Sequence, residues 1–306
     1  MEFSHISVLL EETINALNIK PDGIYVDGTA GGGGHSFHIA SRLKEGKLIA
    51  LDRDPDAIKA ASKRLEGLPA EVVRSNFKDF DKVLDEKGID KIDGMLLDLG
   101  VSSHQLDEGK RGFSYHCDAP LDMRMAQSGP SAADLVNGLS VEQLSEILAR
   151  YGEEKFSFRI AKAIEKARNE APIETTARLA DIISSAVPAA ARRDGHPARK
   201  SFQAIRIAVN GELDALEEVL KKAFYRLKKG GVLAIITFHS LEDRMVKQSF
   251  QNFTKGCICP PDFPVCVCKR TPEGRLVSKK PIIPSEEELK NNSRSRSAKL
   301  RAIERL

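Results

Sequence analysis

The chain has 306 residues, enough for one large domain or for one domain that carries an insertion. Apolar residues make up 41% and charged residues 30%, an ordinary balance for a soluble globular protein. The first residues are acidic and lack the basic start and apolar centre of a signal peptide, and every apolar run is too short to cross a bilayer. These features predict a cytoplasmic protein with no membrane partner.

Charge is distributed unevenly along the chain. The net charge is +3, yet residues 269–306 hold eleven Lys or Arg against five Glu. A basic end on a nearly neutral body favours a polyanionic partner. The alternative is a solvated, partly disordered tail.

Residues 22–100 alternate between strand and helix patterns. Short apolar runs at 23–28, 47–54, 70–76 and 91–100 are separated by segments with helical spacing that end at glycines. Alternation at this spacing predicts right-handed βαβ units and a parallel sheet. The strands are almost continuously apolar, as expected when helices cover both faces of the sheet.

The alternation stops near residue 102. A long segment rich in Gly, Ser and Asp follows, then helical patterns, and a helix and strand return over 213–240. We therefore predict an α/β fold, a doubly wound, mostly parallel Rossmann-like sheet with an inserted helical domain. The sheet domain is expected at 1–104 and 211–306, and the inserted domain at 105–210.

The segment "YVDGTAGGGGHS", residues 25–36, fills the first strand–helix turn. Glycines permit positive φ and let a ligand lie against bare backbone amides. Ligands of open parallel sheets bind beyond the carboxyl ends of the strands, where this turn is expected. About twenty residues on, Asp52 ends the second strand, a spacing that suits a carboxylate bound to ribose hydroxyls.

The ligand of this turn is indicated by what surrounds the glycines. The third glycine of a dinucleotide motif is missing, and no Gly-Lys-Ser/Thr of a P-loop follows. Asp27 fits poorly against a pyrophosphate but well near S-adenosylmethionine (SAM), which carries a sulfonium and an ammonium group. Asp98 ends the fourth strand, within reach of the methyl group or the amino acid part, and Phe77 is expected beside the adenine or in the core. A glycine-rich turn without a ligand is the alternative.

Several long segments carry a family resemblance. The segments are "GTAGGGGHS", "DLGVSSHQLD", "RGFSY", "PLDMRM", "FQAIRIAVNGEL" and "TFHSLEDR". Together they resemble the MraW/RsmH family of small-subunit rRNA cytosine-N4 methyltransferases. The resemblance covers nearly the whole chain and implies a SAM-dependent enzyme that acts on a cytidine in the decoding region of 16S rRNA, with the insertion recognising the substrate. The SAM contacts that it implies are Gly33, Gly34, His35, Asp52, Phe77, Asp98 and Gln105.

The chemistry needs a proton acceptor near the amine. The cytosine amine is a weak nucleophile, and many amino-methyltransferases present an Asp/Asn-Pro-Pro-aromatic box to it, but here that place reads "DLGV". Our hypothesis is that Asp118 and Asp122 supply the acceptor, while Arg124 holds a phosphate or orients an acid. The alternative is that all three only close their loop through turns and an ion pair.

His239 and Ser240 begin "HSLEDR" after a later strand. They are candidates for contacts with the target base or its sugar, although a structural histidine is the commoner case.

Basic side chains indicate the RNA contacts, because they neutralise phosphates and release counterions. Candidates in the connector before residue 201 and on the helix after it are Arg192, Arg193, Arg199, Lys200, Arg206 and Asn210. The C-terminal segment adds Arg294, Arg296, Lys299 and Arg301. The expected partner is 16S rRNA within the small ribosomal subunit, and the prediction allows for a homodimer.

Four of the five cysteines form the pattern C-x-C, six residues, C-x-C, at Cys257, Cys259, Cys266 and Cys268. An odd count in a cytoplasmic chain argues against a disulfide framework. Four thiolates suit a zinc ion, although the usual spacing is C-x₂-C, and a small hairpin of buried thiols is the other interpretation. The family resemblance requires no metal, and we expect none.

Two other classes of function remain open. One is a SAM-binding factor that associates with RNA without catalysis, and the other is an enzyme acting on DNA or protein. The long loop, the insertion and the basic end favour RNA.

Overall fold

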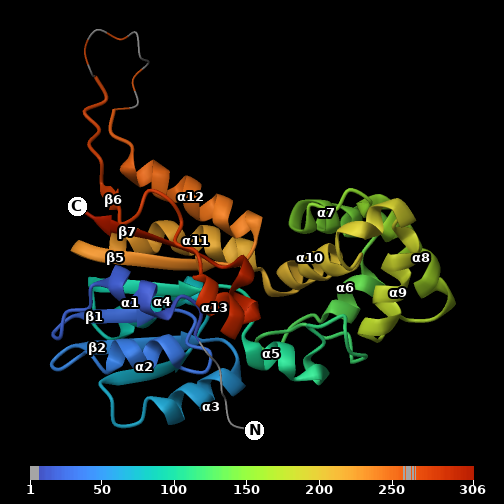
Figure 1. Ribbon diagram of the computed structural model, residues 1–306, viewed down its shortest axis with the longest axis horizontal. Helices are drawn as coiled ribbons and strands as arrows, with labels where there is room; N and C mark the ends of the chain where they lie inside the picture. The colour runs from blue at the N-terminus through green and yellow to red at the C-terminus, as the bar shows by residue number, and fades with distance from the viewer. Residues whose placement is uncertain (1–6, 258, 260–262, 264, 266) are drawn as a thin grey trace. The chain divides into compact units, whose positions relative to one another are not determined.

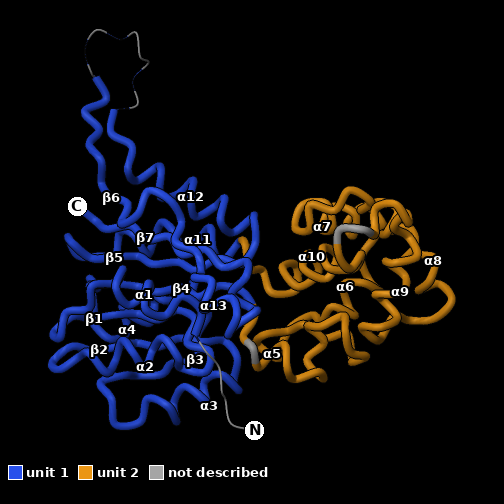
Figure 2. The backbone as a smooth tube through the Cα atoms, viewed as in Figure 1, with its two compact units in different colours: residues 1–100, 214–306 blue, residues 101–213 orange. Residues whose placement is uncertain are grey.

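The computed structural model describes residues 7–257, 259, 263, 265 and 267–306, without the side chains of Ser103, Arg193 and Asp194. The chain divides into two compact units, coloured separately in Figure 2. Unit 1 contains residues 1–100 and 214–306, and unit 2 contains residues 101–213. The sequence predicts these boundaries after residues 104 and 210.

Unit 1 is built on one sheet. Over the described residues, seven strands, labelled in Figure 2, run in the order β3-β2-β1-β4-β5-β7-β6. Strand β7 is antiparallel to both of its neighbours, and the other pairs are parallel. The predicted doubly wound, mostly parallel sheet is therefore confirmed. The strands are β1 (Ile24–Asp27), β2 (Lys47–Asp52), β3 (Ala70–Arg74), β4 (Ile92–Asp98), β5 (Leu227–Thr237), β6 (Gly274–Leu276) and β7 (Lys299–Arg305).

Helices cover both faces of this sheet, because successive strand residues point to opposite sides. Ile49 and Leu51 of β2 join the core under α4 (Phe80–Glu86), α11 (Glu212–Arg226) and α12 (Ser240–Thr254). Leu48 and Ala50 join the core under α1 (Leu10–Leu17), α2 (Gly34–Ala40) and α3 (Pro55–Arg64). The remaining short helices of this unit are η1 (Phe77–Asp79), α13 (Glu286–Asn291) and η4 (Ser293–Ser297).

The sequence predicts a helix that ends at Gly230 and Gly231, but strand β5 begins before these two glycines. Helix α11 ends at Arg226, and the strand starts at Leu227, so Gly230 and Gly231 lie inside the strand and do not end the helix. The register of β5 against β4 shifts between Ile92 and Gly94, which accommodates the extra residues.

The basic C-terminal segment is folded. Its strand β7 pairs with β5 from Val232↔Glu304 to Thr237↔Lys299. Apolar Leu300, Ala302 and Ile303 of this strand are buried. The disordered-tail interpretation is therefore wrong for β7, since its apolar side chains complete the sheet core.

Unit 2 is helical. Its helices pack around an aliphatic core that includes Leu148, Ile160, Ile164, Ile183 and Ile205, all buried. Ser140 and Gln143 form the capping box that their spacing predicts. The elements are α5 (Ser103–Asp107), η2 (Gly109–Arg111), α6 (Ala132–Gly138), α7 (Val141–Gly152), α8 (Ser157–Glu170), α9 (Thr176–Ala186), η3 (Ala189–Asp194) and α10 (Arg199–Asn210).

The long loop before α6 is anchored on this core. Leu121, Met123 and Met125 are buried in it, at every second position of "PLDMRM". The intervening Asp122 and Arg124 point away from the core and pair with each other. The alternation of apolar and charged residues in this motif therefore fixes the loop to unit 2.

Among the residues that the structure describes, no helix combines the length and the apolar character needed to cross a bilayer.

Candidate functional site

Three acids end neighbouring strands at the carboxyl edge of the sheet in unit 1. Asp27 is the last residue of β1, Asp52 of β2 and Asp98 of β4. Strand β1 lies between β2 and β4, so the chain reverses its direction of strand addition between β1 and β4. Such a switch point is where open α/β sheets bind ligands.

The glycine turn after β1 is held by the second of these acids. The amide of Gly31 donates a hydrogen bond of 2.8 Å to Oδ2 of Asp52. Gly31 has φ +52°, and a Cβ built there meets only the Thr29 carbonyl oxygen, 3.9 Å away. The backbone at Gly31 is therefore open, as expected for a surface on which a ligand lies.

Gly33 and Gly34, the two glycines with an implied SAM contact, lie close to other protein atoms. A Cβ at Gly34 would lie 2.0 Å from Oγ of Ser7, and a Cβ at Gly33 would lie 3.3 Å from Cα of Ala61. A side chain at Gly33 is therefore disfavoured by this close contact and by its φ of +76°, whereas the Ser7 side chain near Gly34 can move, so both glycines are compatible with a ligand that lies against the backbone. Their backbone amides begin α2, where an anionic group is stabilised.

Asp27 is buried and stabilises the glycine turn through hydrogen bonds from residues of the turn and of α2. Its Oδ2 accepts a hydrogen bond of 2.6 Å from Oγ of Ser36, and Oδ1 accepts one of 3.1 Å from the amide of Thr29. Burial raises the pKa of Asp27 to about 6, and these hydrogen bonds oppose the shift. Oγ1 of Thr29 also accepts the amide of Asp98 at 2.6 Å, which connects the ends of β1 and β4.

Asp98 carries the most perturbed carboxyl group of the edge. Its Oδ1 is inaccessible to solvent and makes no hydrogen bond with the described residues. Burial raises the pKa of Asp98 well above its usual value, and the charges of Asp27 and Glu242 add to the shift. Such an atom is unfavourable unless a further partner satisfies it.

His35 lies against Asp98 and is buried. Its Nδ1 is 3.6 Å from Oδ2 of Asp98, and its Nε2 is 3.1 Å from the carbonyl oxygen of Val8. Because a carbonyl only accepts, Nε2 carries a hydrogen, and in the neutral ring Nδ1 is then an acceptor that faces Asp98. A protonated Asp98 suits this arrangement.

This edge fits a cationic ligand. Burial is the first cause that raises the pKa of Asp27, Asp52 and Asp98, and neighbouring acids add to each shift. A bound positive charge would stabilise the ionised carboxylates, which burial otherwise disfavours. The residues present therefore suit the sulfonium and ammonium groups of SAM, while Asp52 retains lone pairs for the ribose.

Phe77 and Gln105 occupy different units. Phe77 begins η1 after β3, is half-buried, and packs partly against the sheet core, so both expected roles agree with its position. Gln105 belongs to unit 2, where it is buried and completes a capping box with Ser102 at the start of α5.

His239 caps the start of α12. Its Nδ1 accepts the amide of Glu242 at 3.4 Å, and its Nε2 lies 3.2 Å from Oε1 of Glu242. The Glu242 carboxylate in turn accepts the amide of Phe238 at 2.8 Å. The capping contact of Nδ1 favours the structural role for His239, while its buried Nε2 makes no hydrogen bond with the described residues. Ser240 is exposed at the first position of the helix.

Asp122 and Arg124 form an ion pair within their loop. Nη2 of Arg124 is 2.6 Å from Oδ2 of Asp122, and Nε is 3.1 Å from both carboxylate oxygens. Burial raises the pKa of Asp122, but hydrogen bonds from Arg124 outweigh it and lower the pKa overall. A carboxylate with a lowered pKa is a weaker base, so these contacts favour the loop-closing role.

Asp118 is exposed and accepts the amide of Ala177 at 3.3 Å, near the start of α9.

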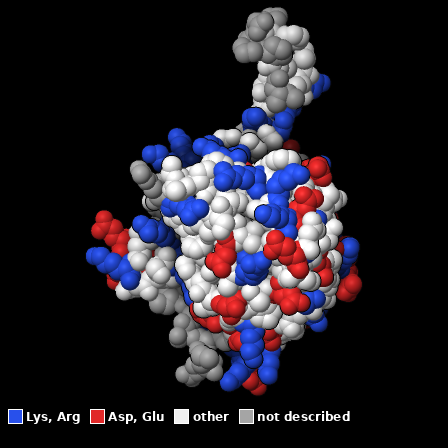
Figure 3. Space-filling model, turned by 90° about the vertical axis from the view of Figure 1, so that its right-hand side faces the viewer, with Lys and Arg blue, Asp and Glu red and all other residues white. Residues whose placement is uncertain are grey.

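The connector before α10 presents exposed basic side chains. Nε of Arg192 donates to the carbonyl oxygen of Val187 at 2.9 Å, and Nζ of Lys200 to that of Glu153 at 3.4 Å. Arg199 is exposed at the start of α10, and the side chain of Arg193 lies outside the described part. On the face shown in Figure 3, basic and acidic side chains are interspersed.

Asn210 does not fit an RNA contact. Its side chain is 6% exposed, its Oδ1 accepts the amide of Met125 at 2.9 Å, and its Nδ2 donates to the carbonyl oxygens of Met123 and Arg206. The prediction is corrected, because this amide fixes the loop to α10. Arg206 is largely buried too, and its guanidinium pairs with Glu212 at 2.8 Å.

Two of the C-terminal basic residues are also committed to the fold. Lys299 and Arg301 of β7 pair with Asp243 of α12, at 3.2 and 2.7 Å. Arg294 and Arg296 are exposed on η4.

Sequence reasoning missed three residues that shape the carboxyl edge, namely Thr29, Ser36 and Glu242. Glu242 had a readable signal, since a glutamate three residues after a capping position is typical of a helix start. Ser36 and Thr29 had none, because ordinary hydroxyl residues near a turn carry no pattern of their own.

The fold and the acids at its carboxyl edge define a Rossmann-like, SAM-dependent methyltransferase. The chain belongs to the MraW methylase family, whose model matches residues 2–306, and this confirms the resemblance drawn from its motifs.

Curated relatives match along the whole chain. It is 56% identical over 309 residues to "Ribosomal RNA small subunit methyltransferase H" of Clostridium botulinum, covering 100% of both chains. It is 56% identical over 311 residues to the protein of that name from Lachnospira eligens, covering 100% of this chain and 99% of the relative. A solved rRNA methylase from Streptococcus thermophilus is 13% identical, with a TM-score of 0.44 and 99% of each chain covered.

Proposed function

We propose that this protein transfers a methyl group from SAM to the exocyclic N4 amine of a cytidine in the decoding region of 16S rRNA, in the cytoplasm. The observation that carries the proposal is the match, at 56% identity over the full length, to relatives named small-subunit rRNA methyltransferase H. The acids at the ends of β1, β2 and β4 support it independently, since they suit a cationic nucleoside.

Residues of unit 1 bind the donor in this proposal. Asp52 accepts hydrogen bonds from the ribose hydroxyls, and the open backbone at Gly31 lies under the ligand. The amides that begin α2 at Gly34 and His35 face the carboxylate of the amino acid part. Asp98 faces the positive charges and Phe77 borders the adenine. Gln105 belongs to unit 2, and only the family resemblance implies its contact with SAM. When bound, SAM supplies an electrophilic methyl group on a positively charged sulfur.

Catalysis depends mainly on positioning. The amine lone pair is delocalised into the cytosine ring, so the chain must hold the nitrogen in line with the methyl group, an effect worth about 7–11 kcal/mol in favourable cases. The amine then releases a proton. Asp118 is the better candidate acceptor, because Asp122 is held by Arg124 at 2.6 Å with a lowered pKa.

Unit 2 recognises the RNA in this proposal. Arg192, Arg193, Arg199 and Lys200 contact phosphates within the small ribosomal subunit, where the target base is unpaired or extruded to reach the donor. This role agrees with the exposure of Arg192, Arg199 and Lys200.

Methyl transfer to isolated small subunits tests the function. Subunits from cells that lack this gene are incubated with the protein and methyl-labelled SAM, and the rRNA is digested to nucleosides. We expect the label in N4-methylcytidine. Label at another atom would refute the assigned target, and SAM binding without incorporation would support the non-catalytic RNA-association factor. A parallel reaction with naked 16S rRNA tells which form is the substrate.

A further inference from the structure

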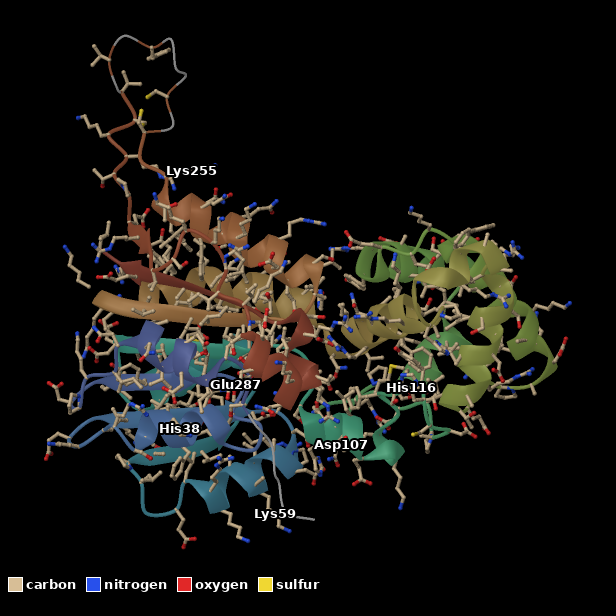
Figure 4. All side chains as sticks on the ribbon, in the orientation of Figure 1. His38, Lys59, Asp107, His116, Lys255 and Glu287 are labelled. Carbon is tan, nitrogen blue, oxygen red and sulfur yellow. The ribbon has the colours of Figure 1, made fainter. Side chains whose placement is uncertain are left out.

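The segment between α12 and β6 leaves the body of unit 1 as two chain stretches that begin side by side (Figure 1). The amide of Glu273 donates to the carbonyl oxygen of Phe253 at 2.9 Å, and Nη2 of Arg270 donates to that of Asn252 at 2.6 Å. Lys255 is labelled at the foot of this segment in Figure 4. The two stretches bring cysteines from both ends of the C-x-C pattern together.

Three sulfur atoms come together in this segment, beyond the point where its two stretches leave the body of unit 1. Those of Cys257, Cys259 and Cys268 all lie within 4.8 Å of one another, and the Sγ atoms of Cys257 and Cys268 are 3.7 Å apart. None of these three described cysteines is in a disulfide. Cys266, the other residue of the pattern, lies outside the described residues.

The surroundings exclude the buried-thiol interpretation for these three. Cys257 is exposed, and Cys259 and Cys268 are only partly covered. The apolar side chains expected to bury them are themselves exposed, Phe263 by 52% and Val265 by 70%. Hydrophobic packing therefore does not explain why the thiols meet.

The distances match a tetrahedral metal site. Zinc–sulfur bonds of about 2.3 Å in a tetrahedron place neighbouring sulfurs about 3.8 Å apart. In addition, the amide of Cys259 donates to Sγ of Cys257 at 3.4 Å, a contact that stabilises a thiolate and orients it.

We propose that Cys257, Cys259 and Cys268 bind a zinc ion. Thiolates are soft ligands that favour zinc, and tetrahedral sulfur sites are typical of it. On binding, each thiol loses its proton to solvent and forms one sulfur–zinc bond, so three thiolates and Zn²⁺ carry a net charge of −1.

The ion has a structural purpose in this position. Phe263, Val265 and Val267, the apolar residues of the segment whose exposure is described, all face solvent. Short segments without a hydrophobic core are stabilised by metals or disulfides. The site is separate from the carboxyl edge of the sheet, so it is independent of the proposed methyl transfer.

Metal analysis of the full-length protein tests the site. The wild type, a Cys257→Ser/Cys268→Ser double variant and a Cys117→Ser control are loaded with Zn²⁺ under a thiol-free reductant. Weakly held ions are removed by gel filtration, and metals are quantified. The control removes an exposed cysteine of unit 2, and SAM titration verifies that each variant is folded.

We expect about one zinc ion per chain in the wild type and the control, and at least tenfold less in the double variant. With Co²⁺ in place of Zn²⁺, the wild type should show thiolate-to-metal charge transfer that the double variant lacks. Zinc retained equally by the double variant, no zinc in the wild type, or iron or copper in its place in protein purified without loading would overturn the proposal.

Discussion

The main-chain amide of Gly31 donates a hydrogen bond of 2.8 Å to Oδ2 of Asp52. This bond joins the turn after β1 to the end of β2, while Oδ1 of Asp52 accepts the amide of Asp54 at 2.9 Å. Each carboxylate oxygen has a second lone pair, so Asp52 can hold the turn and still accept hydrogen bonds from ribose hydroxyls. One carboxylate therefore shapes the backbone surface and binds the sugar that lies on it.

Replacing Asp98 should raise the stability of the ligand-free protein and weaken its binding of SAM. At pH 7, Asp98→Asn replaces a carboxyl group that folding must either bury as a charge or protonate, because burial and the charges of Asp27 and Glu242 raise its pKa. We expect the free energy of unfolding of the ligand-free protein to rise by about 1 kcal/mol. We also expect SAM affinity to fall at least tenfold. Thermal denaturation and calorimetric titration measure the two effects, and unchanged affinity would contradict the role of Asp98.

SAM affinity should depend on pH through Asp27. Its pKa is raised to about 6, so the folded, ligand-free protein binds a proton there as the pH falls below 6. A free Asp has a pKa near 3.9, so the stability from this proton is complete below about pH 4 and is lost as the pH rises through 6.

Bound SAM favours the unprotonated form of Asp27, whereas the ligand-free protein is stabilised by the protonated form. The positive charge of SAM favours the ionised carboxylate, so the contribution of Asp27 to the affinity should weaken by up to about tenfold per pH unit below 6 and level off above it. Dissociation constants from pH 5 to 8 measure the profile. Asp27→Asn should flatten it, and a flat profile in the wild type would show that Asp27 is not coupled to the ligand.

The two loop acids should differ in their effect on catalysis. At saturating SAM and RNA, we expect Asp118→Asn to reduce the rate of methyl transfer at least tenfold, because it removes the proposed acceptor. Asp122→Asn should mainly lower the melting temperature, because it breaks the ion pair with Arg124. Single-turnover kinetics measure the first effect. A loss below tenfold for both variants would remove these acids from the chemistry.

Charge reversal in unit 2 should weaken RNA binding selectively. Replacing Arg192, Arg193, Arg199 and Lys200 by Glu removes phosphate contacts, so affinity for the small subunit should fall and its salt dependence should become shallower. SAM affinity should stay within about twofold, because its proposed ligands lie elsewhere. Filter binding at several salt concentrations measures the change.

A control variant with the same change in net charge tells whether the loss of RNA binding comes from these four basic residues or from net charge alone. Exposed residues before and along α8 serve for it, namely Lys155, Arg159, Lys162 and Lys166. Reversing these four should weaken RNA binding much less. Equal losses in both variants would mean that net charge, and not the connector, determines affinity.

Much of unit 1 is readable from the sequence. The strands up to residue 100 are nearly continuous apolar runs, and glycines stand in the turns that follow the helices, so local patterns and tertiary structure agree on the order of the elements. Strand β7 is difficult to predict from the sequence because charged residues alternate with its apolar ones. The basic composition of this segment favours a solvated tail instead. In Lys299–Arg305 the buried Leu300 and Ala302 follow the period of a strand.

The site could be predicted only where a residue type implies its chemistry. Asp52 and Asp98 were identifiable because acids at the ends of parallel strands converge at one edge. Asn210 was misassigned, because a polar residue on an amphipathic helix does not show which backbone groups it will satisfy. The buried Met123 and Met125 were missed for a similar reason, since alternation in a loop gives no regular element to recognise.

Calorimetric titration of the wild type and of Asp52→Asn with SAM tests the central claim most directly, with Asp22→Asn, an exposed change in unit 1, as the control. We expect one site per chain in the wild type and the control. The Asp52 variant should bind about 10- to 100-fold more weakly, since hydrogen bonds to a charged group contribute about 1.5–3 kcal/mol. Equal affinity in all three proteins, or no binding by the wild type, would contradict a SAM site at the carboxyl edge of this sheet.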